Sequence, residues 1–111
     1  MTYNQKEIVL IPFPYSDLSG LKQRPALIIS NKTINKTDDR ICCLITSNQS
    51  KDGIKIADDF FEDGNLPFES WIKPHRLFTI NKKIIRKKLC TINDDFYDDL
   101  IRRINEIIKR N

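Results

Sequence analysis

Arg24 and His75 are the side chains whose types and positions most directly suggest chemistry in this 111-residue sequence. An arginine guanidinium stays charged and presents a planar fork of donors to phosphate oxygens. Arg24 immediately precedes Pro25, and a residue before proline is biased to an extended backbone, which limits the directions of its side chain. His75 is the only histidine, and a histidine with its ordinary pKa of about 6.5 suits proton transfer at neutral pH.

Each of these side chains also has an ordinary structural interpretation. A surface arginine often pairs with a loop acid, here Asp17, and His75 lies in a basic segment where an exposed histidine is common. Thr46 ends an apolar run, where its hydroxyl can donate to a phosphoryl oxygen. A threonine at the end of a strand is more often a β-former with a backbone partner, so position alone leaves both interpretations open.

The composition is that of a globular domain, with 40% hydrophobic and 31% charged residues. No stretch approaches the roughly 18 apolar residues of a membrane helix, and the N-terminus lacks the features of a secretory signal. We therefore expect one domain over residues 1–111, in the cytoplasm, with no membrane partner and no cofactor. The formal net charge of +4 permits a polyanionic partner, although it also fits a solvated surface.

The three cysteines are expected to be buried, inert thiols. Cys42 and Cys43 are adjacent, so on a strand they point to opposite faces and are poor disulfide partners. The sequence has no C-x-x-C pair or Cys/His spacing of a zinc site. No metal site is predicted.

Short apolar runs rich in β-branched residues predict that most of the chain is β-strand. The expected strands cover residues 7–12, 25–30, 40–47, 54–57, 70–77 and 88–92. Residues 13–24 contain turn-forming residues and are expected to be a loop, residues 31–39 have room for one helical turn, and residues 58–64 form an acidic connector. Short strands at this spacing indicate a small β-barrel.

The C-terminal segment changes to a helical period. Its apolar residues recur at three-and-four spacing: Phe96, Tyr97, Leu100, Ile101, Ile104, Ile107 and Ile108. Asn93 is the expected N-cap, while Asp94 and Asp95 suit the positive end of the helix dipole and Lys109 and Arg110 its negative end. The fold class is therefore mostly β with α, a barrel with a C-terminal amphipathic helix.

Residues 8–30, which read IVLIPFPYSDLSGLKQRPALIIS, resemble the N-terminal signature of the MazF/PemK-like toxins. That signature is a strand, an F-x-D-L-S-G-type loop, then R-P-A-L and a second strand. The runs CLITS at 43–47 and SWIKPHRLFTI at 70–80 also match the family. Two positions depart from it, because the glycine that commonly precedes the first strand is replaced by the Lys6-Glu7 pair and a glycine of the last strand corresponds to Cys90.

The resemblance implies a small SH3-like antiparallel β-barrel, a homodimer, and sequence-selective cleavage of single-stranded RNA without a metal. It also implies control by an antitoxin within a type II toxin-antitoxin system. Such cleavage proceeds by attack of the adjacent 2′-hydroxyl and leaves a 2′,3′-cyclic phosphate and a 5′-hydroxyl. The enzyme must accept a proton, stabilise charge on the phosphate and help the 5′-oxygen leave.

Arg24 and Thr46 are the catalytic positions that the resemblance implies. Arg24 suits the stabilisation of charge and the departure of the leaving oxygen, and Thr46 becomes a catalytic candidate through its pairing with Arg24. The proton acceptor stays open between His75, Asp17 and no side chain at all. Asp17 also has a structural interpretation, because aspartate commonly shapes turns.

The clustering of basic and aromatic residues in the sequence suggests an RNA-binding surface. Its candidates are Phe13, Tyr15, Asp17, Ser19, Lys22, Ser47, Lys73 and Arg76, with further phosphate contacts possible at Lys82, Lys83, Arg86, Lys87 and Lys88. In the expected loop, Phe13 and Tyr15 would stack on splayed bases, whereas the alternating strand positions of Trp71 and Phe78 indicate core residues. An antitoxin with an acidic and apolar tail would compete for the same groove.

Two other functions fit the same barrel. A toxin of this fold can poison DNA gyrase through a C-terminal surface, but the tail RRINEIIKRN offers no aromatic anchor of the kind that dominates interfaces. A non-catalytic RNA-binding barrel fits the basic charge equally well. Binding without cleavage would distinguish that second alternative.

Overall fold

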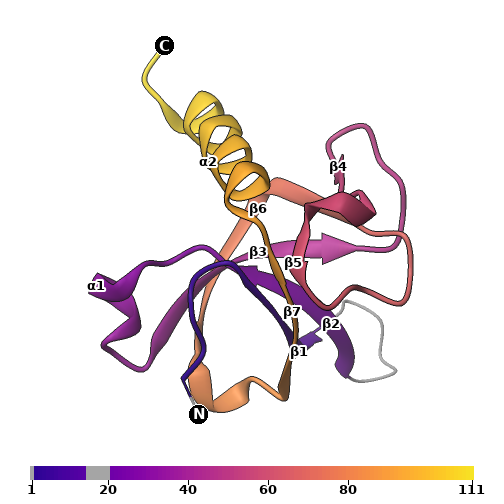
Figure 1. Ribbon diagram of the computed structural model, residues 1–111. Helices are drawn as coiled ribbons and strands as arrows, with labels where there is room; N and C mark the ends of the chain where they lie inside the picture. The colour runs from indigo at the N-terminus through magenta and orange to yellow at the C-terminus, as the bar shows by residue number, and fades with distance from the viewer. Residues whose placement is uncertain (1, 15–20) are drawn as a thin grey trace.

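A computed structural model describes residues 2–14 and 21–111, which form one antiparallel sheet and two α-helices (Figure 1). The strands are β1 (Glu7–Pro14), β2 (Leu21–Ile28), β3 (Asp39–Thr46), β4 (Ile54–Lys55), β5 (Phe61–Asp63), β6 (Trp71–Asn81) and β7 (Lys87–Ile92). The helices are α1 (Lys32–Asn35) and α2 (Asp94–Ile108), and two 3-10 turns are η1 (Asp58–Phe60) and η2 (Lys82–Ile84). The seven strands follow the order β4-β6-β3-β2-β1-β7-β5. This half-barrel with a C-terminal helix confirms the predicted fold class.

The prediction of a loop over residues 13–24 is wrong at both boundaries, because β1 continues to Pro14 and β2 already begins at Leu21. β7 pairs with β1 over Glu7 to Leu10, so the prolines of β1 lie beyond that ladder, where a missing backbone donor costs little. Pro25 in β2 likewise comes just before the ladder that β2 forms with β3. Each proline is tolerated because its strand is paired on one side only at that point.

Two other boundaries differ from the sequence prediction. β6 is longer than the strand expected over residues 70–77, because its second half pairs with the first half of β3. Pro74 lies within β6 where the register shifts opposite Cys43 and Ile45, an irregularity that accommodates a residue without a donor. The connector expected over residues 58–64 contains η1 and the short strand β5.

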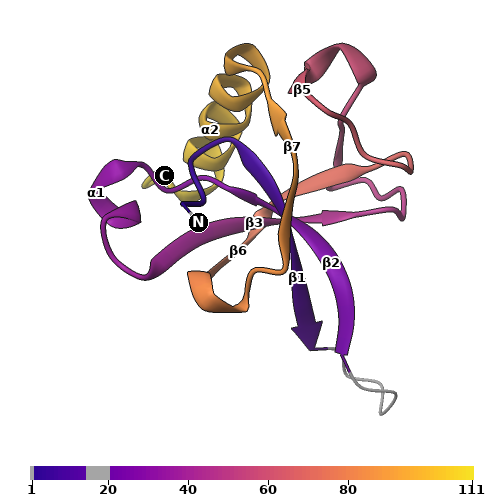
Figure 2. The same cartoon turned by 60° about the horizontal axis from the view of Figure 1, so that its bottom comes forward.

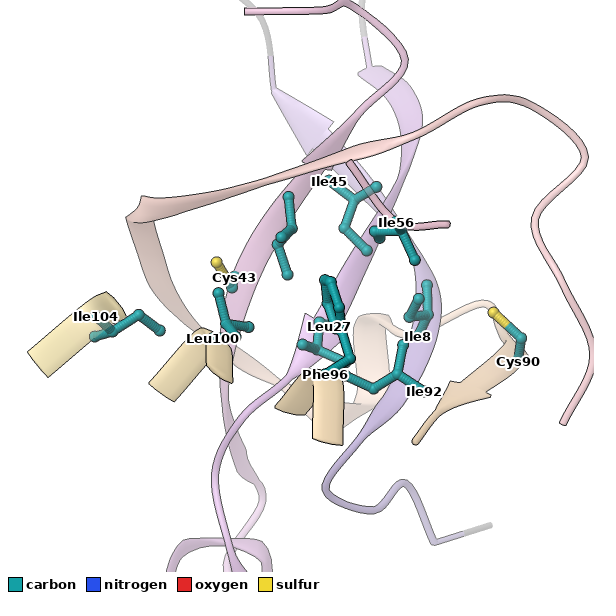
Figure 3. Close-up of a cluster of buried hydrophobic side chains, with 11 residues drawn as sticks. Ile8, Leu27, Cys43, Ile45, Ile56, Cys90, Ile92, Phe96, Leu100 and Ile104 are labelled. Carbon is teal, nitrogen blue, oxygen red and sulfur yellow. The ribbon is translucent and has the colours of Figure 1, made fainter. Parts of the chain in front are cut away.

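Both faces of the central strands are covered, which explains why their sequences are apolar without alternation. One buried cluster includes Leu27 and Cys43 from the sheet and Phe96 from α2 (Figure 3). A second cluster on the opposite face includes Ala26 and Cys42. Neighbouring residues of β2 and β3 therefore belong to different clusters, and the opposite orientation predicted for the two cysteines is confirmed.

All three cysteines are buried free thiols, as expected. Burial raises the pKa of Cys42 and Cys43 to about 12 and that of Cys90 to about 11, because the thiolate would lose its hydration. At neutral pH the three side chains are therefore uncharged and contribute to packing.

Helix α2 begins at the predicted cap, where the Asn93 side chain accepts a hydrogen bond of 2.8 Å from the Phe96 backbone N–H. Phe96, Leu100 and Ile104 are its buried residues, and Figure 3 shows all three in the core cluster. Burial of each such side chain contributes about 1.5–3 kcal/mol. The end of β1 and the start of β2 lie away from α2 in both views of the chain (Figures 1 and 2).

Lys6, which replaces a common family glycine together with Glu7, has a φ of 76°. This left-handed conformation costs a residue with a Cβ about 1–2 kcal/mol. The Lys6 ammonium lies 2.6 Å from Asp94 Oδ1 and 3.4 Å from Glu62 Oε1. The backbone at this position thus keeps a glycine-like shape, while the side chain pairs with acids of β5 and α2.

The variants Lys6→Gly and Lys6→Ala separate backbone strain from ion pairing. Both variants lose the ammonium, but only alanine keeps the Cβ that the left-handed conformation disfavours. We expect the glycine variant to be more stable than the alanine variant by about 1 kcal/mol in urea unfolding. Equal stabilities of the two variants would contradict strain at this position.

Candidate functional site

The pairing of β2 with β3 brings Arg24 and Thr46 together. Ala26 pairs with Leu44 at the end of that ladder, and two residues further along each strand the side chains return to the same face. Arg24 Nη1 lies 3.5 Å from Thr46 Oγ1, although the two residues are 22 positions apart in sequence. Sheet register therefore builds a guanidinium–hydroxyl pair that the motifs alone could only suggest.

The Thr46 hydroxyl is held in a defined orientation. Thr46 is buried, and its Oγ1 accepts a hydrogen bond of 3.1 Å from the backbone N–H of Asn48. Its oxygen thus faces donors from Asn48 and Arg24, so the hydroxyl hydrogen is directed toward another acceptor. An incoming anionic oxygen is the type of group that this hydrogen suits.

A cavity of about 540 Å³ includes Arg24 in its lining. The cations Lys22, Arg24 and Lys87 line it together with Ser47 and the apolar segment 66–68. No acidic residue contributes to the lining within the part of the chain that the structure describes. The charges around the cavity therefore suit an anionic ligand.

His75 is not part of this cavity. It is exposed and lines a separate cavity of about 580 Å³ with Leu77 and the end of α2. In β6, Trp71 is the residue that pairs with Thr46, and His75 follows in the irregular stretch of the strand. The structure does not bring His75 together with Arg24 and Thr46 within one chain.

The charged and hydroxyl candidates for RNA contacts divide into two groups. Lys22 and Ser47 line the cavity of Arg24, and Lys87 joins them from β7. Lys73 is half-buried and Arg76 is exposed on β6, and neither lines that cavity. The structure therefore gathers only part of the expected basic surface around the Arg24–Thr46 pair.

The aromatic candidates also separate. Phe13 lies in β1 rather than in a loop, and its ring meets Phe78 edge-on with centroids 5.4 Å apart. Both rings pack against the second core cluster. The prediction that Phe13 lies in a loop is therefore wrong, and the prediction that Phe78 belongs to the core is confirmed. Tyr15, Asp17 and Ser19 lie outside the described residues.

Two residues near the pair were not singled out by the sequence. Asn48 supplies the backbone donor to Thr46 and lines the cavity, as does Phe68. Phe68 comes from the connector before β6, where no periodic pattern marks a functional residue. The only sequence signal was an aromatic residue directly after a proline, Pro67, in a loop.

Residues 2–14 and 21–111 contain neither a cluster of metal ligands nor a helix that could span a membrane. Within these residues, His, Cys, Asp and Glu side chains form no group of three that could hold a metal ion. None of the helices described has the length and apolar character needed to cross a membrane.

Comparison with known proteins assigns the chain to a family. The sequence model of the PemK-like, MazF-like toxins of type II toxin-antitoxin systems matches residues 4–108. A solved MazE-MazF structure from Deinococcus radiodurans has a TM-score of 0.80 at 14% identity, covering 100% of this chain and 99% of that one. An endoribonuclease in complex with its cognate antitoxin, from a mycobacterial species, has a TM-score of 0.75 at 13% identity, covering 98% and 97%. Curated protein sequences include no match. The chain belongs to the PemK-like, MazF-like toxin family of type II toxin-antitoxin systems.

Proposed function

We propose that this toxin is an endoribonuclease that cleaves single-stranded RNA by attack of the adjacent 2′-hydroxyl, without a metal ion. The observation that carries the proposal is the 3.5 Å contact between Arg24 Nη1 and Thr46 Oγ1 beside a cationic cavity. Family membership supports it, and one solved protein of the same fold is named an endoribonuclease.

Arg24 performs the electrostatic part of the reaction. As the 2′-oxygen bonds to phosphorus, negative charge grows on the non-bridging phosphoryl oxygens, and a fixed guanidinium stabilises that charge more than it stabilises the ground state. The same fork of donors can reach the 5′-oxygen as its bond to phosphorus breaks. The strand β2 holds the side chain, so little reorganisation accompanies the reaction.

Thr46 donates its hydroxyl hydrogen to a phosphoryl oxygen. Its Oγ1 accepts from the Asn48 backbone N–H, and this contact leaves the hydroxyl hydrogen as the donor to the phosphate. Together the two side chains fix the phosphate relative to the attacking oxygen, which is the positional part of catalysis. The candidates for the proton acceptor are His75 and Asp17, and the alternative is a reaction in which no side chain accepts the proton.

The role of His75 is tested by the variant His75→Ala. Because His75 lies outside the cavity of Arg24, we expect the variant to cleave RNA within about tenfold of the wild-type rate, a change smaller than loss of a general base produces. The wild-type rate should then show no inflection between pH values of about 6 and 7. A loss of orders of magnitude together with such an inflection would instead identify His75 as the base.

An antitoxin protein is the proposed partner of this toxin. Family membership supports this, and the mycobacterial protein of the same fold was solved with its cognate antitoxin. We expect an acidic and apolar segment of the antitoxin to compete with RNA, because the cavity of Arg24 combines cations with apolar residues. Inhibition of cleavage that RNA does not relieve by competition would contradict a shared site. We propose a cytoplasmic location, because the proposed substrate is messenger RNA.

A homodimer is the proposed assembly. Leu77, Ile107 and Ile108 are 38%, 55% and 68% exposed and line one cavity with His75. Apolar side chains gathered in this way favour burial against another surface. A monomeric mass in light scattering would contradict the dimer.

Incubation of the purified protein with single-stranded RNA in excess EDTA tests the proposed function. We expect the wild-type protein to cleave the RNA under these conditions, because Arg24 and Thr46 take the electrostatic role that a metal ion would otherwise have. Binding without cleavage would favour a non-catalytic RNA-binding barrel. Cleavage only after metal is added would overturn the metal-free mechanism.

A further inference from the structure

Phe68 is 73% exposed, which is the largest exposed fraction among the large hydrophobic side chains in the described part of the chain. It also lines the cavity that contains Arg24. We propose that Phe68 is a stacking platform for a base next to the phosphate held at Arg24. The inference rests on the proposed function and assigns Phe68 a positioning role in binding RNA.

The segment that carries Phe68 is anchored on both sides of the ring. Leu66 packs against the core cluster beneath α2, and Pro67 has a restricted backbone. The Ser70 hydroxyl donates a hydrogen bond of 2.9 Å to the Phe68 carbonyl oxygen. The exposed ring is therefore presented from an ordered segment, which lowers the entropy lost when a ligand covers it.

The turn that leads into this segment depends on Gly64, which has a φ of 71°. A Cβ at this position would lie 3.1 Å from Cys90 Cβ and 3.1 Å from the Leu89 carbonyl oxygen. Leu89 lines the same cavity as Phe68. Glycine therefore lets the segment pass close to β7, on the side where the cavity lies.

Charge selects the side of Phe68 on which an RNA strand lies. Phe68 also lines a second cavity, but that cavity contains Asp58 and Glu69, and its Lys55 pairs with Glu69 at 3.3 Å. The cavity of Arg24 has cations and no described acid in its lining. A polyanionic strand is therefore attracted toward the Arg24 side and repelled from the other.

An aromatic ring at this place contributes affinity more than base choice. Every base has a flat face, so stacking tolerates sequence, and removal of a stacking ring weakens binding by roughly 5- to 150-fold. Base selection depends instead on hydrogen bonds to base edges. The expected effect of losing Phe68 is therefore a similar loss of affinity for many sequences.

The test compares Phe68→Ala, Phe68→Trp and the control Ile84→Ala in the full chain. Ile84 is also an exposed apolar residue, at 41%, but does not line the cavity of Arg24. The probe is a mixed-sequence RNA oligonucleotide with 2′-O-methyl groups, which lacks the attacking hydroxyl. We expect Phe68→Ala to raise the Kd by about tenfold, and the other two variants to match the wild type. In Phe68→Trp, RNA should quench tryptophan emission more than it does in the wild type, whose single tryptophan is Trp71.

Cleavage kinetics provide a second measurement. Phe68→Ala should raise KM for cleavable RNA with little change in kcat, whereas a disturbed active site would lower kcat. An unchanged Kd in Phe68→Ala would overturn the inference. Contact with a protein partner would then be the alternative role of the exposed ring. Absence of RNA binding by the wild type would instead defeat the proposed function, so the two failures are distinguishable.

Discussion

Replacing Arg24 with alanine is expected to reduce the rate of RNA cleavage by about 10³-fold or more while the protein stays folded. The guanidinium is the group that lies against Thr46 at the cationic cavity, and its loss removes the charge that stabilises the phosphate as the 2′-oxygen attacks. The measurement is the single-turnover cleavage rate, with circular dichroism and thermal unfolding as checks of the fold. A well-folded Arg24→Ala protein with full activity would contradict the assigned role.

Two further variants make the Arg24 experiment more specific. Arg24→Lys keeps the positive charge but loses the planar fork, so we expect activity between those of wild type and Arg24→Ala. Thr46→Val keeps the shape of the side chain and removes the hydroxyl. If both groups act on one phosphate, the double variant should lose less than the product of the two single losses.

Replacing Arg40 with alanine is expected to lower the free energy of unfolding by about 3 kcal/mol or more. Arg40 is only 2% exposed. Its Nε donates to the Tyr3 carbonyl oxygen at 2.8 Å, and its Nη1 donates to the carbonyl oxygens of Thr37 at 2.9 Å and Asp39 at 2.7 Å. Alanine would leave these acceptors without their donors and open a cavity beside the N-terminal segment.

Urea unfolding of Arg40→Ala, Arg40→Met and the control Arg86→Ala measures this effect. Methionine restores part of the buried volume but none of the hydrogen bonds, so its stability should lie between those of alanine and wild type. The Arg86 side chain is exposed, and its removal should change stability by about 0.5 kcal/mol or less. Equal stabilities of Arg40→Ala and Arg86→Ala would show that the buried hydrogen bonds contribute little.

The strands and the final helix were largely predictable because burial leaves a pattern in the sequence. Cys42 and Cys43 lie in one apolar run because the two faces of β3 contact different clusters. The ends of strands were less predictable, since Leu21 belongs to β2 through its pairing with Pro14 across the hairpin. Pro14 is a residue type that favours turns, and only the pairing with the partner strand overrides this local preference.

The candidate site was only partly predictable for the same reason. The motifs indicated Arg24 and Thr46, and their 3.5 Å contact depends on the register of β2 and β3, which no local pattern specifies. His75 follows Trp71 closely in sequence, but the irregular stretch of β6 places it on another cavity. Phe68 lay in a connector without periodicity, so only its exposure and its place in the cavity identified it.

The chemical identity of the ends left by cleavage tests most directly whether a 2′-hydroxyl attacks at Arg24 and Thr46. Purified toxin in excess EDTA is incubated with single-stranded RNA, and the fragments are analysed by mass spectrometry. The proposed mechanism predicts a 2′,3′-cyclic phosphate on one fragment and a 5′-hydroxyl on the other, with both absent from the Arg24→Ala reaction. Fragments that carry a 3′-hydroxyl and a 5′-phosphate would contradict it.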